Sequence, residues 1–362
     1  MNATVSFKRQ LAELKQEIDA ALEEHAASLR RIAAQEYTPY SAAAVDAFTQ
    51  VLGRGGKRIR GALTAIGYGM CGGTDQKMII QAACAIEITH AYILVLDDIM
   101  DKSMKRRGGA SAHMLLADYH ASRGLSGDSY HFGEAVAING ALIGNHYAQK
   151  LVTELAVDDR YKLKALALLN DALMVTGHGQ INDLFNEVLD TIDGAAVDNV
   201  LVWKTAHYSF LNPLQFGMAL AGADQVSLDG IAPYCMHAGR AFQITDDILG
   251  TFGSEQEAGK SPTDDIREGK RTLLTLNGLQ KASSADKNFL IQMLGNERLT
   301  QVEFSRCKEI LVATGALETV QEEAAKHIAE AKTSLEVSAH LWNRAGTDFL
   351  SALVGQLLGR TA

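Results

Sequence analysis

Residues 78–100, MIIQAACAIEITHAYILVLDDIM, form the stretch of sequence that decides the fold. The stretch is almost continuously apolar, and the polar side chains that interrupt it are Gln81, Glu87, Thr89, His90, Asp97 and Asp98. A helix that is apolar nearly all round is normally buried at the centre of a domain. The sequence therefore predicts a central helix that carries an acidic pair at its C-terminal end.

The flanking sequence also indicates helices. Val5 to Ile32 carries apolar residues at intervals of three and four positions, the period of an amphipathic helix, and a helical pattern returns from Leu317 to Trp342. Glycines at 67–75 predict a break, and the composition of Asp118 to Gly133 predicts an exposed loop. Because strand signals are weak throughout, we expect a single all-α domain over residues 1–362.

Composition excludes several classes of protein. The fractions of 47% apolar and 21% charged residues are those of a globular chain. A net charge of −9 argues against nucleic-acid binding, which needs a basic surface. The 4 cysteines have no paired spacing, as is typical of a reduced cytoplasmic protein. Neither a signal segment nor an uninterrupted apolar run of the ~20 residues that span a bilayer is evident, so we expect a cytoplasmic protein with no transmembrane segment.

Two acidic motifs about 150 residues apart carry the strongest functional signal. They are LDDIMD at 96–101 and QITDDILG at 243–250, with the carboxylates Asp97, Asp98, Asp101, Asp246 and Asp247. Asp97 and Asp101 are four positions apart, so both side chains lie on one face of a helix. Because Mg²⁺ is commonly shared between carboxylates and phosphates, the motifs predict a site for magnesium and diphosphate. A solvated helix end is the alternative for either motif alone.

Basic residues accompany the acidic motifs. Arg106 and Arg107 follow the first motif, and Lys260 and Lys270 follow the second, in GKSPTDDIREGKRT at 259–272. A third cluster, GGKRIR at 55–60, supplies Lys57 and Arg60 on a glycine-rich backbone. Guanidinium groups and loop N–H groups bind phosphate oxygens well. A basic surface turn is the alternative for each cluster alone.

Other polar residues have weaker individual signals. His90 lies seven positions before Asp97, on roughly the same helix face, and is either a phosphate contact or a satisfied core histidine. Gln243 lies one turn before the second acidic pair and extends its polar face. Lys204 and Thr205, in WKTAHYSF, carry little information by themselves.

Taken in order, these motifs resemble the trans-polyprenyl diphosphate synthase family, and most closely its geranylgeranyl diphosphate synthases. The matching motifs are GGKRIR, DDIMD with a trailing RRG, GQIND, KT, FQITDD and GKSPTDDIREGKRT, between about residues 50 and 275. The resemblance implies a single polyprenyl synthetase domain with the isoprenoid synthase fold, a large antiparallel helical bundle around a deep central cavity. It also implies a homodimer.

The resemblance further implies a Mg²⁺-dependent prenyltransferase that condenses isopentenyl diphosphate head to tail with allylic diphosphates. Three Mg²⁺ ions would be bound by the aspartates of the two motifs. Isopentenyl diphosphate would be bound by Lys57, Arg60, His90 and Arg107, and the allylic diphosphate by Arg106, Lys204, Lys260 and Lys270. Lys204, Thr205 and Gln243 would form the catalytic group, the last two offering dipoles to the allylic carbocation.

Product length is expected to depend on Tyr92 and Ile93, which precede Asp97 by five and four positions. A single aromatic residue here resembles enzymes that make geranylgeranyl diphosphate, the C20 product. Farnesyl synthases would have two aromatic residues, and synthases of longer products would have small residues at both positions.

Three positions depart from the family pattern, and two other classes of protein stay open. Leu96 replaces a frequent histidine, Ala141 replaces an aspartate, and Gly250 replaces the third aspartate of the second motif. A non-catalytic subunit of a heteromeric synthase would keep the fold and lose metal ligands. A class I terpene cyclase would share the fold, but it would bind no second diphosphate and leave GGKRIR and Arg107 without a purpose.

Overall fold

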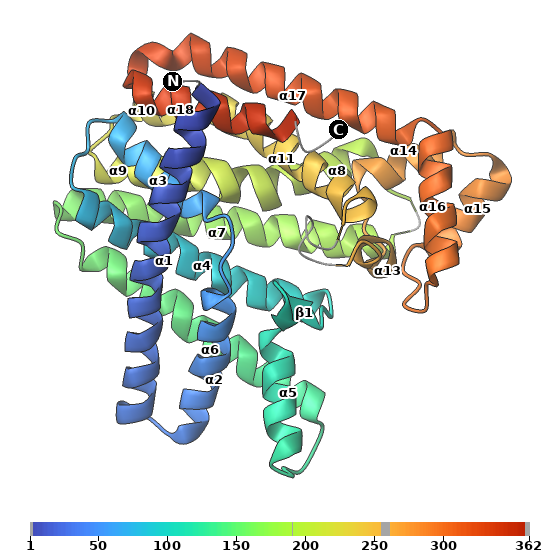
Figure 1. Ribbon diagram of the computed structural model, residues 1–362, viewed down its shortest axis with the longest axis horizontal. Helices are drawn as coiled ribbons and strands as arrows, with labels where there is room; N and C mark the ends of the chain where they lie inside the picture. The colour runs from blue at the N-terminus through green and yellow to red at the C-terminus, as the bar shows by residue number, and fades with distance from the viewer. Residues whose placement is uncertain (1–2, 190, 255–260, 359–362) are drawn as a thin grey trace. The chain divides into compact units, whose positions relative to one another are not determined.

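The computed structural model describes residues 3–189, 191–254 and 261–358 (Figure 1). Within these ranges the chain is helical apart from its connections and one small hairpin. The hairpin pairs β1 (Lys105–Arg106) with β2 (Gly109–Ala110), and Arg106 lies opposite Gly109. The predicted all-α fold class is confirmed.

The chain divides into two compact units. The first consists of residues up to 166 together with 216–222, and the second consists of 167–215 and the residues from 223 onward. The single domain expected from the sequence stays a prediction.

The first unit is organised around the long apolar helix. Its helices are α1 (Ala3–Glu36), α2 (Pro39–Gly53), α3 (Ile59–Met70), α4 (Gln76–Met100), α5 (Ala112–Ser122) and α6 (Ser129–Thr153). Helix α4 packs against the other five, most extensively against α6. Helix α4 is the one described helix long and apolar enough to cross a membrane, but 72% of its most apolar window is buried, as expected of a core helix. The predicted central helix is therefore confirmed.

Helix α1 covers part of this core with one face, as its sequence period predicts. Phe7, Leu14, Ile18 and Leu22 are buried, while Leu11 is partly exposed. The two faces differ because the apolar residues recur every three or four positions along a helix with 3.6 residues per turn. Helix α1 in turn packs on α2, α3 and α4.

The second unit is built around α11. Its elements include α8 (Gly194–Val200), the π-helix η1 (Leu201–Leu211), α10 (Gln225–Gly230), α11 (Ala232–Phe252), α13 (Asp264–Glu268), α14 (Leu273–Lys281), α15 (Ser284–Met293), α16 (Gln301–Ala313), α17 (Ala316–Ser338), the 3₁₀ turn η2 (Ala339–Leu341) and α18 (Arg344–Leu358). Helix α17 lies along α11 (Figure 1). The π-helix η1 packs on α11 as well. Ile244 and Ile248 of α11 share a core cluster with Leu201, Val320 and Ala324.

Helices α7 (Asp159–Val188) and α9 (Asn212–Leu220) each contribute to both units. In the second unit, α7 approaches the backbone of η1 at a glycine. A Cβ atom on Gly179 would lie 2.6 Å from the backbone nitrogen of Lys204, closer than real Cβ contacts come. Gly179 therefore lets α7 reach the part of η1 that carries Lys204 and Thr205.

Two predicted breaks were placed too broadly. Helix α3 continues through Gly67 and Gly69 to Met70, so only residues 71–75 connect it to α4. The expected loop from Asp118 to Gly133 is wrong over most of its length, because α5 ends at Ser122 and α6 begins at Ser129. The Asp128 side chain caps α6 by accepting a hydrogen bond from the Tyr130 N–H at 2.9 Å.

The glycine contact gives a prediction with a control two positions away. Gly179→Ala forces the backbone of η1 to move, and we expect a loss of about 1–3 kcal/mol in the free energy of unfolding. A Cβ atom on Gly177, also in α7, would meet nothing within 4 Å. Gly177→Ala is therefore expected to be neutral or to stabilise by up to about 1 kcal/mol, because alanine is the better helix former. Urea titration measures the free energy of unfolding of both variants. Equal unfolding midpoints would contradict the close contact between α7 and η1 at Gly179.

Candidate functional site

The first acidic motif occupies the C-terminal end of α4. Asp97 lies in the last turn, and Asp101 caps the helix with its N–H bonded to the Asp97 carbonyl at 2.8 Å. Both side chains are partly exposed. The C-terminal end of a helix carries a partial negative charge, so several carboxylates gathered there repel it and one another. A bound cation would relieve that repulsion.

Asp98 differs from its neighbours, because its side chain is fully buried. Nε of Arg106 donates to Asp98 Oδ1 at 2.7 Å, and a terminal nitrogen of the same guanidinium donates to the same oxygen. Burial raises the pKa of Asp98 to about 6, and the Arg106 charge opposes that rise. The same terminal nitrogen lies 3.9 Å from Asp97 Oδ2. The hairpin residue Arg106 is thus held beside both carboxylates.

Arg107, the next residue, is held by the loop between α2 and α3. Its guanidinium donates to the Gly55 carbonyl. The same group packs on Gly56, where an added Cβ atom would lie only 3.0 Å from it. Burial and three neighbouring guanidinium groups lower the pKa of Arg107 to about 10. Arginine side chains that repel one another in a partly buried place form a site in which an anion is favoured.

The loop GGKRIR places its three cations in different environments. Arg58 is buried, and its guanidinium pairs with Asp19 at 2.7 Å and with Glu87 of α4 at 3.3 Å. Lys57 is exposed, while Arg60 is partly buried at the start of α3. Arg58 therefore anchors the loop, and the loop presents Lys57 to solvent.

Arg60 reaches His90 on α4. One guanidinium nitrogen of Arg60 lies 3.2 Å from Nε2 of His90, and a guanidinium group can only donate. Nε2 therefore accepts, and the ring proton lies on Nδ1. Burial and the nearby Arg60 charge hold the pKa of His90 well below its ordinary value, so the ring is neutral at physiological pH. The sequence had suggested a phosphate contact or a core histidine for this residue, and did not predict its contact with Arg60.

Backbone strain is concentrated in the same region. Among the described non-glycine residues, positive φ angles occur at Arg58 (50°), Lys102 (52°) and Arg107 (49°). Such conformations cost free energy for residues with a Cβ atom, and they persist where surrounding contacts hold them. Here the contacts are the ion pairs of Arg58 and the bond from Arg107 to the Gly55 carbonyl.

In the second unit a chain of hydrogen bonds links η1 to α11. The Thr205 hydroxyl donates to Gln243 Oε1 at 2.7 Å, and Gln243 Nε2 donates to Asp247 Oδ1 at 2.8 Å. These bonds fix the orientation of the Gln243 amide. Asp246 and Asp247 are both partly exposed on α11.

The predicted lysines of the second unit have acidic partners. Lys204 Nζ donates to Asp183 of α7 at 2.8 Å, and Lys270 Nζ pairs with Glu268 at 3.0 Å. Lys260 lies outside the described residues. Asp97 belongs to the first unit and Asp246 to the second.

Sequence reasoning missed the anchoring role of Arg58, which it counted only as one more loop cation. A signal for it was present, because Glu87 interrupts a buried apolar run and needs a cationic partner there. Of the three departures from the family pattern, Ala141 and Gly250 are buried and Leu96 is partly buried.

The Arg58–Glu87 pair leads to a prediction about stability. Arg58→Met leaves the Glu87 carboxylate buried without its partner, and we expect a loss of about 3–5 kcal/mol in the free energy of unfolding. The exposed neighbour gives the control, since Lys57→Met should change that free energy by less than about 0.5 kcal/mol. The double variant Arg58→Met/Glu87→Met should recover most of the loss. Denaturant titration measures all three, and an Arg58→Met protein as stable as the parent would refute the anchoring role.

Comparison with known proteins agrees with these motifs. The polyprenyl synthetase family matches residues 42–311. A geranylgeranyl diphosphate synthase of Saccharolobus solfataricus is 32% identical over 71% of this chain and 73% of its own. A geranylfarnesyl diphosphate synthase of Aeropyrum pernix is 29% identical over 78% of this chain and 83% of its own.

A solved structure is similar over nearly the whole length. It is the geranylgeranyl pyrophosphate synthase from Corynebacterium glutamicum complexed with isoprenyl diphosphate and magnesium. That protein is 27% identical, with a TM-score of 0.88 over 97% of this chain and 99% of its own. The chain therefore belongs to the polyprenyl synthetase family, and it is a short-chain trans-prenyl diphosphate synthase with the all-α isoprenoid synthase fold that acts on isoprenoid diphosphates.

Proposed function

We propose that this enzyme condenses isopentenyl diphosphate with allylic diphosphates in a Mg²⁺-dependent reaction and releases mainly geranylgeranyl diphosphate. The observation that carries the proposal is the group of arginines beside the first acidic motif. Arg106 contacts Asp98 and lies near Asp97, while Arg60 and Arg107 lie in the same electrostatic neighbourhood. Guanidinium groups bind the oxygens of a diphosphate, and the carboxylates beside them can bind its metal ions.

The aspartates fit magnesium as oxygen ligands. We assign three Mg²⁺ ions to Asp97 and Asp101 of the first unit and to Asp246 and Asp247 of the second. When bound, the ions neutralise charge on the diphosphate leaving group and so favour heterolysis of the allylic C–O bond. The fit rests on the two carboxylates gathered at the negative end of α4 and on the partly exposed pair on α11.

Asp98, which the sequence also suggested as a metal ligand, has a different part in the proposal. Its carboxylate is buried and bonded to Arg106. We assign it to the orientation of the Arg106 guanidinium toward the allylic diphosphate. The Arg106 charge already offsets that of this carboxylate, and the full burial of Asp98 keeps a hydrated metal ion away from it.

The remaining cations are assigned to the two diphosphates. Isopentenyl diphosphate is bound by Lys57, Arg60, His90 and Arg107. The neutral His90 can donate its Nδ1 proton, and its bond with Arg60 keeps the ring in place. The allylic diphosphate is bound by Arg106, Lys204, Lys260 and Lys270.

Thr205 and Gln243 stabilise the carbocation in this proposal. The Gln243 carbonyl oxygen has two lone pairs, and the Thr205 hydroxyl uses one of them. The other lone pair, together with the Thr205 hydroxyl oxygen and backbone carbonyl, offers negative partial charge to the allylic cation. Fixed dipoles of this kind need no reorganisation when the charge develops. The π bond of isopentenyl diphosphate then attacks, and the released diphosphate takes the proton that leaves.

Product length is assigned to Tyr92 and Ile93. Both residues are partly buried on α4 and lie about 6–8 Å along the helix from Asp97. An aromatic ring at this depth can close the path of a growing prenyl chain. The homodimer remains a prediction from the family resemblance, and the cytoplasmic location remains a prediction from the sequence composition.

The assay that tests the function incubates the purified chain with labelled isopentenyl diphosphate, Mg²⁺ and each of the C5, C10 and C15 allylic diphosphates. Elongated prenyl diphosphates ending at C20 are the expected result. Cyclic hydrocarbons from an allylic diphosphate alone would indicate a cyclase instead. No product with any primer would identify a non-catalytic subunit.

Replacement of a proposed metal ligand should affect catalysis more than folding. Asp97→Asn removes one anionic oxygen ligand, so we expect kcat to fall about 10²–10³-fold and the Mg²⁺ requirement to rise. Asp118→Asn, on the exposed surface of α5, is the control and should keep the parent kcat. Circular dichroism of both variants checks the fold. A parent-like kcat and Mg²⁺ dependence in Asp97→Asn would remove Asp97 from the metal site.

Tyr92 gives a prediction about the product. Tyr92→Ala removes the ring that we assign to the end of the chain path, so prenyl diphosphates longer than C20 should accumulate. Tyr92→Phe keeps the ring and should keep the C20 product. Chromatography of the dephosphorylated products distinguishes the two. An unchanged product from Tyr92→Ala would show that another side chain sets the length.

A further inference from the structure

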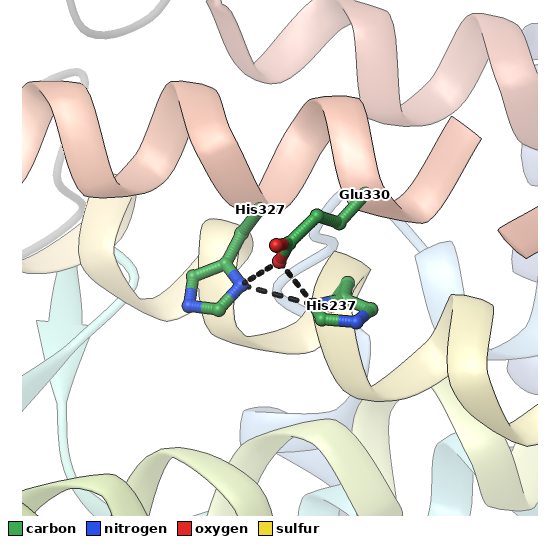
Figure 2. Close-up of side chains that lie close together, drawn as sticks. All are labelled: His237, His327 and Glu330. Carbon is green, nitrogen blue, oxygen red and sulfur yellow. Dashed lines mark hydrogen bonds and ion pairs between the residues drawn. The ribbon is translucent and has the colours of Figure 1, made fainter. Parts of the chain in front are cut away.

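A cluster of two histidines and a glutamate lies between α11 and α17 in the second unit. Figure 2 shows His237 rising from α11 toward His327 and Glu330, which project from α17. Nδ1 of His237 lies 3.0 Å from Nδ1 of His327 and 3.1 Å from Oε2 of Glu330. Nδ1 of His327 lies 3.4 Å from the same carboxylate oxygen. Three potential ligand atoms therefore form a nearly equilateral triangle.

The size of the triangle fits a small transition-metal ion. Zinc binds imidazole nitrogen and carboxylate oxygen at about 2.0–2.1 Å, which places tetrahedral ligand atoms about 3.3 Å apart. The three observed separations of 3.0, 3.1 and 3.4 Å lie around that value. Two imidazole nitrogens and one carboxylate oxygen also favour Zn²⁺, Ni²⁺ or Co²⁺ over Mg²⁺, which prefers oxygen alone.

The surroundings of His327 match those of a metal-bound imidazole. Its other ring nitrogen, Nε2, lies 3.3 Å from the carboxylate of Glu323, one helical turn earlier on α17. Metal-bound histidines usually donate their second N–H to a carboxylate, which fixes the ring and leaves the first nitrogen free to bind the ion. Glu323 thus puts the proton on Nε2 and leaves Nδ1 as the ligand.

Nearby charges are compatible with a cation. Arg240 is bonded to both carboxylate oxygens of Asp198, at 2.6 and 2.7 Å, and Lys326 pairs with Glu323. Burial lowers the pKa of both His237 and His327, which keeps the imidazoles in the neutral form that binds metal. The side chain of Glu330 is 41% exposed, so an ion from solvent can reach the cluster.

We propose that His237, His327 and Glu330 bind one divalent transition-metal ion, with Zn²⁺ as the best fit, and that the ion joins α11 to α17. Three protein ligands leave a tetrahedral position for water. Gln243 and the second acidic pair lie further along α11, about 9 Å or more from His237 along the helix axis. The site is therefore separate from the diphosphate site, and its role is to fix the helix that carries those residues.

The experiment uses the full-length chain, stripped with a chelator and kept in excess Mg²⁺ so that the aspartates are saturated. Titration with Zn²⁺ against a chromophoric chelator should give one equivalent of bound zinc. His237→Asn and His327→Asn should each abolish that equivalent. Glu323→Gln should weaken the affinity about 10–100-fold, because it acts through the ring of His327. His340→Asn, an exposed histidine on η2, is the control and should bind like the parent.

Two further measurements distinguish this site from the aspartates. Co²⁺ at two nitrogens and one oxygen in tetrahedral geometry gives intense visible absorption, whereas six-coordinate oxygen ligation gives weak bands. Zn²⁺ should also raise the melting temperature of the parent but not of the two histidine variants. The proposal is overturned if the parent binds no zinc equivalent, if binding survives in both histidine variants, or if Asp246→Asn rather than His327→Asn removes it.

Discussion

The first unit depends on two ion pairs that a buried helix is forced to make. Helix α4 is the core helix of this unit, yet it carries Glu87 and Asp98 at fully buried positions. An isolated carboxylate in such a place costs several kcal/mol, so each requires a cationic partner. Arg58 supplies one partner and Arg106 the other. Because these arginines come from a loop and a hairpin, the two pairs also fix the loop that carries Arg60 and the hairpin that carries Arg107 against α4.

The same constraint explains why neighbouring residues of one motif have different tasks. Asp97, Asp98 and Asp101 are identical in chemistry and nearly adjacent in sequence, but only Asp98 is fully buried. Arg58 and Lys57 differ in the same way. The buried member of each set forms an ion pair, Asp98 with Arg106 and Arg58 with Glu87, and the more exposed members are the ones that we propose as ligand contacts.

The sequence was sufficient for the central helix and for α1, because each follows from a local period. It was insufficient to predict the buried ion pairs of Arg58 and Asp98. Their partners are distant in the chain or lie in a hairpin, which no local period reveals. Asp19, for example, precedes Arg58 by 39 positions. The expected loop at Asp118 to Gly133 was wrong for a related reason. Its Gly, Ser and His residues favour a loop by composition, whereas packing of α5 on α6 keeps most of the segment helical.

Helix α11 carries two kinds of potential metal ligand, and their donor atoms favour different ions. Asp246 and Asp247 offer only oxygen, which suits a hard ion that retains much of its water. His237 offers nitrogen, and with His327 and Glu330 it forms a set that Mg²⁺ binds poorly. Magnesium in large excess would therefore fill the aspartates without displacing a softer ion from the histidines. If α11 binds zinc at its histidine and magnesium at its aspartates, the donor atoms of each site are sufficient to select between the two ions.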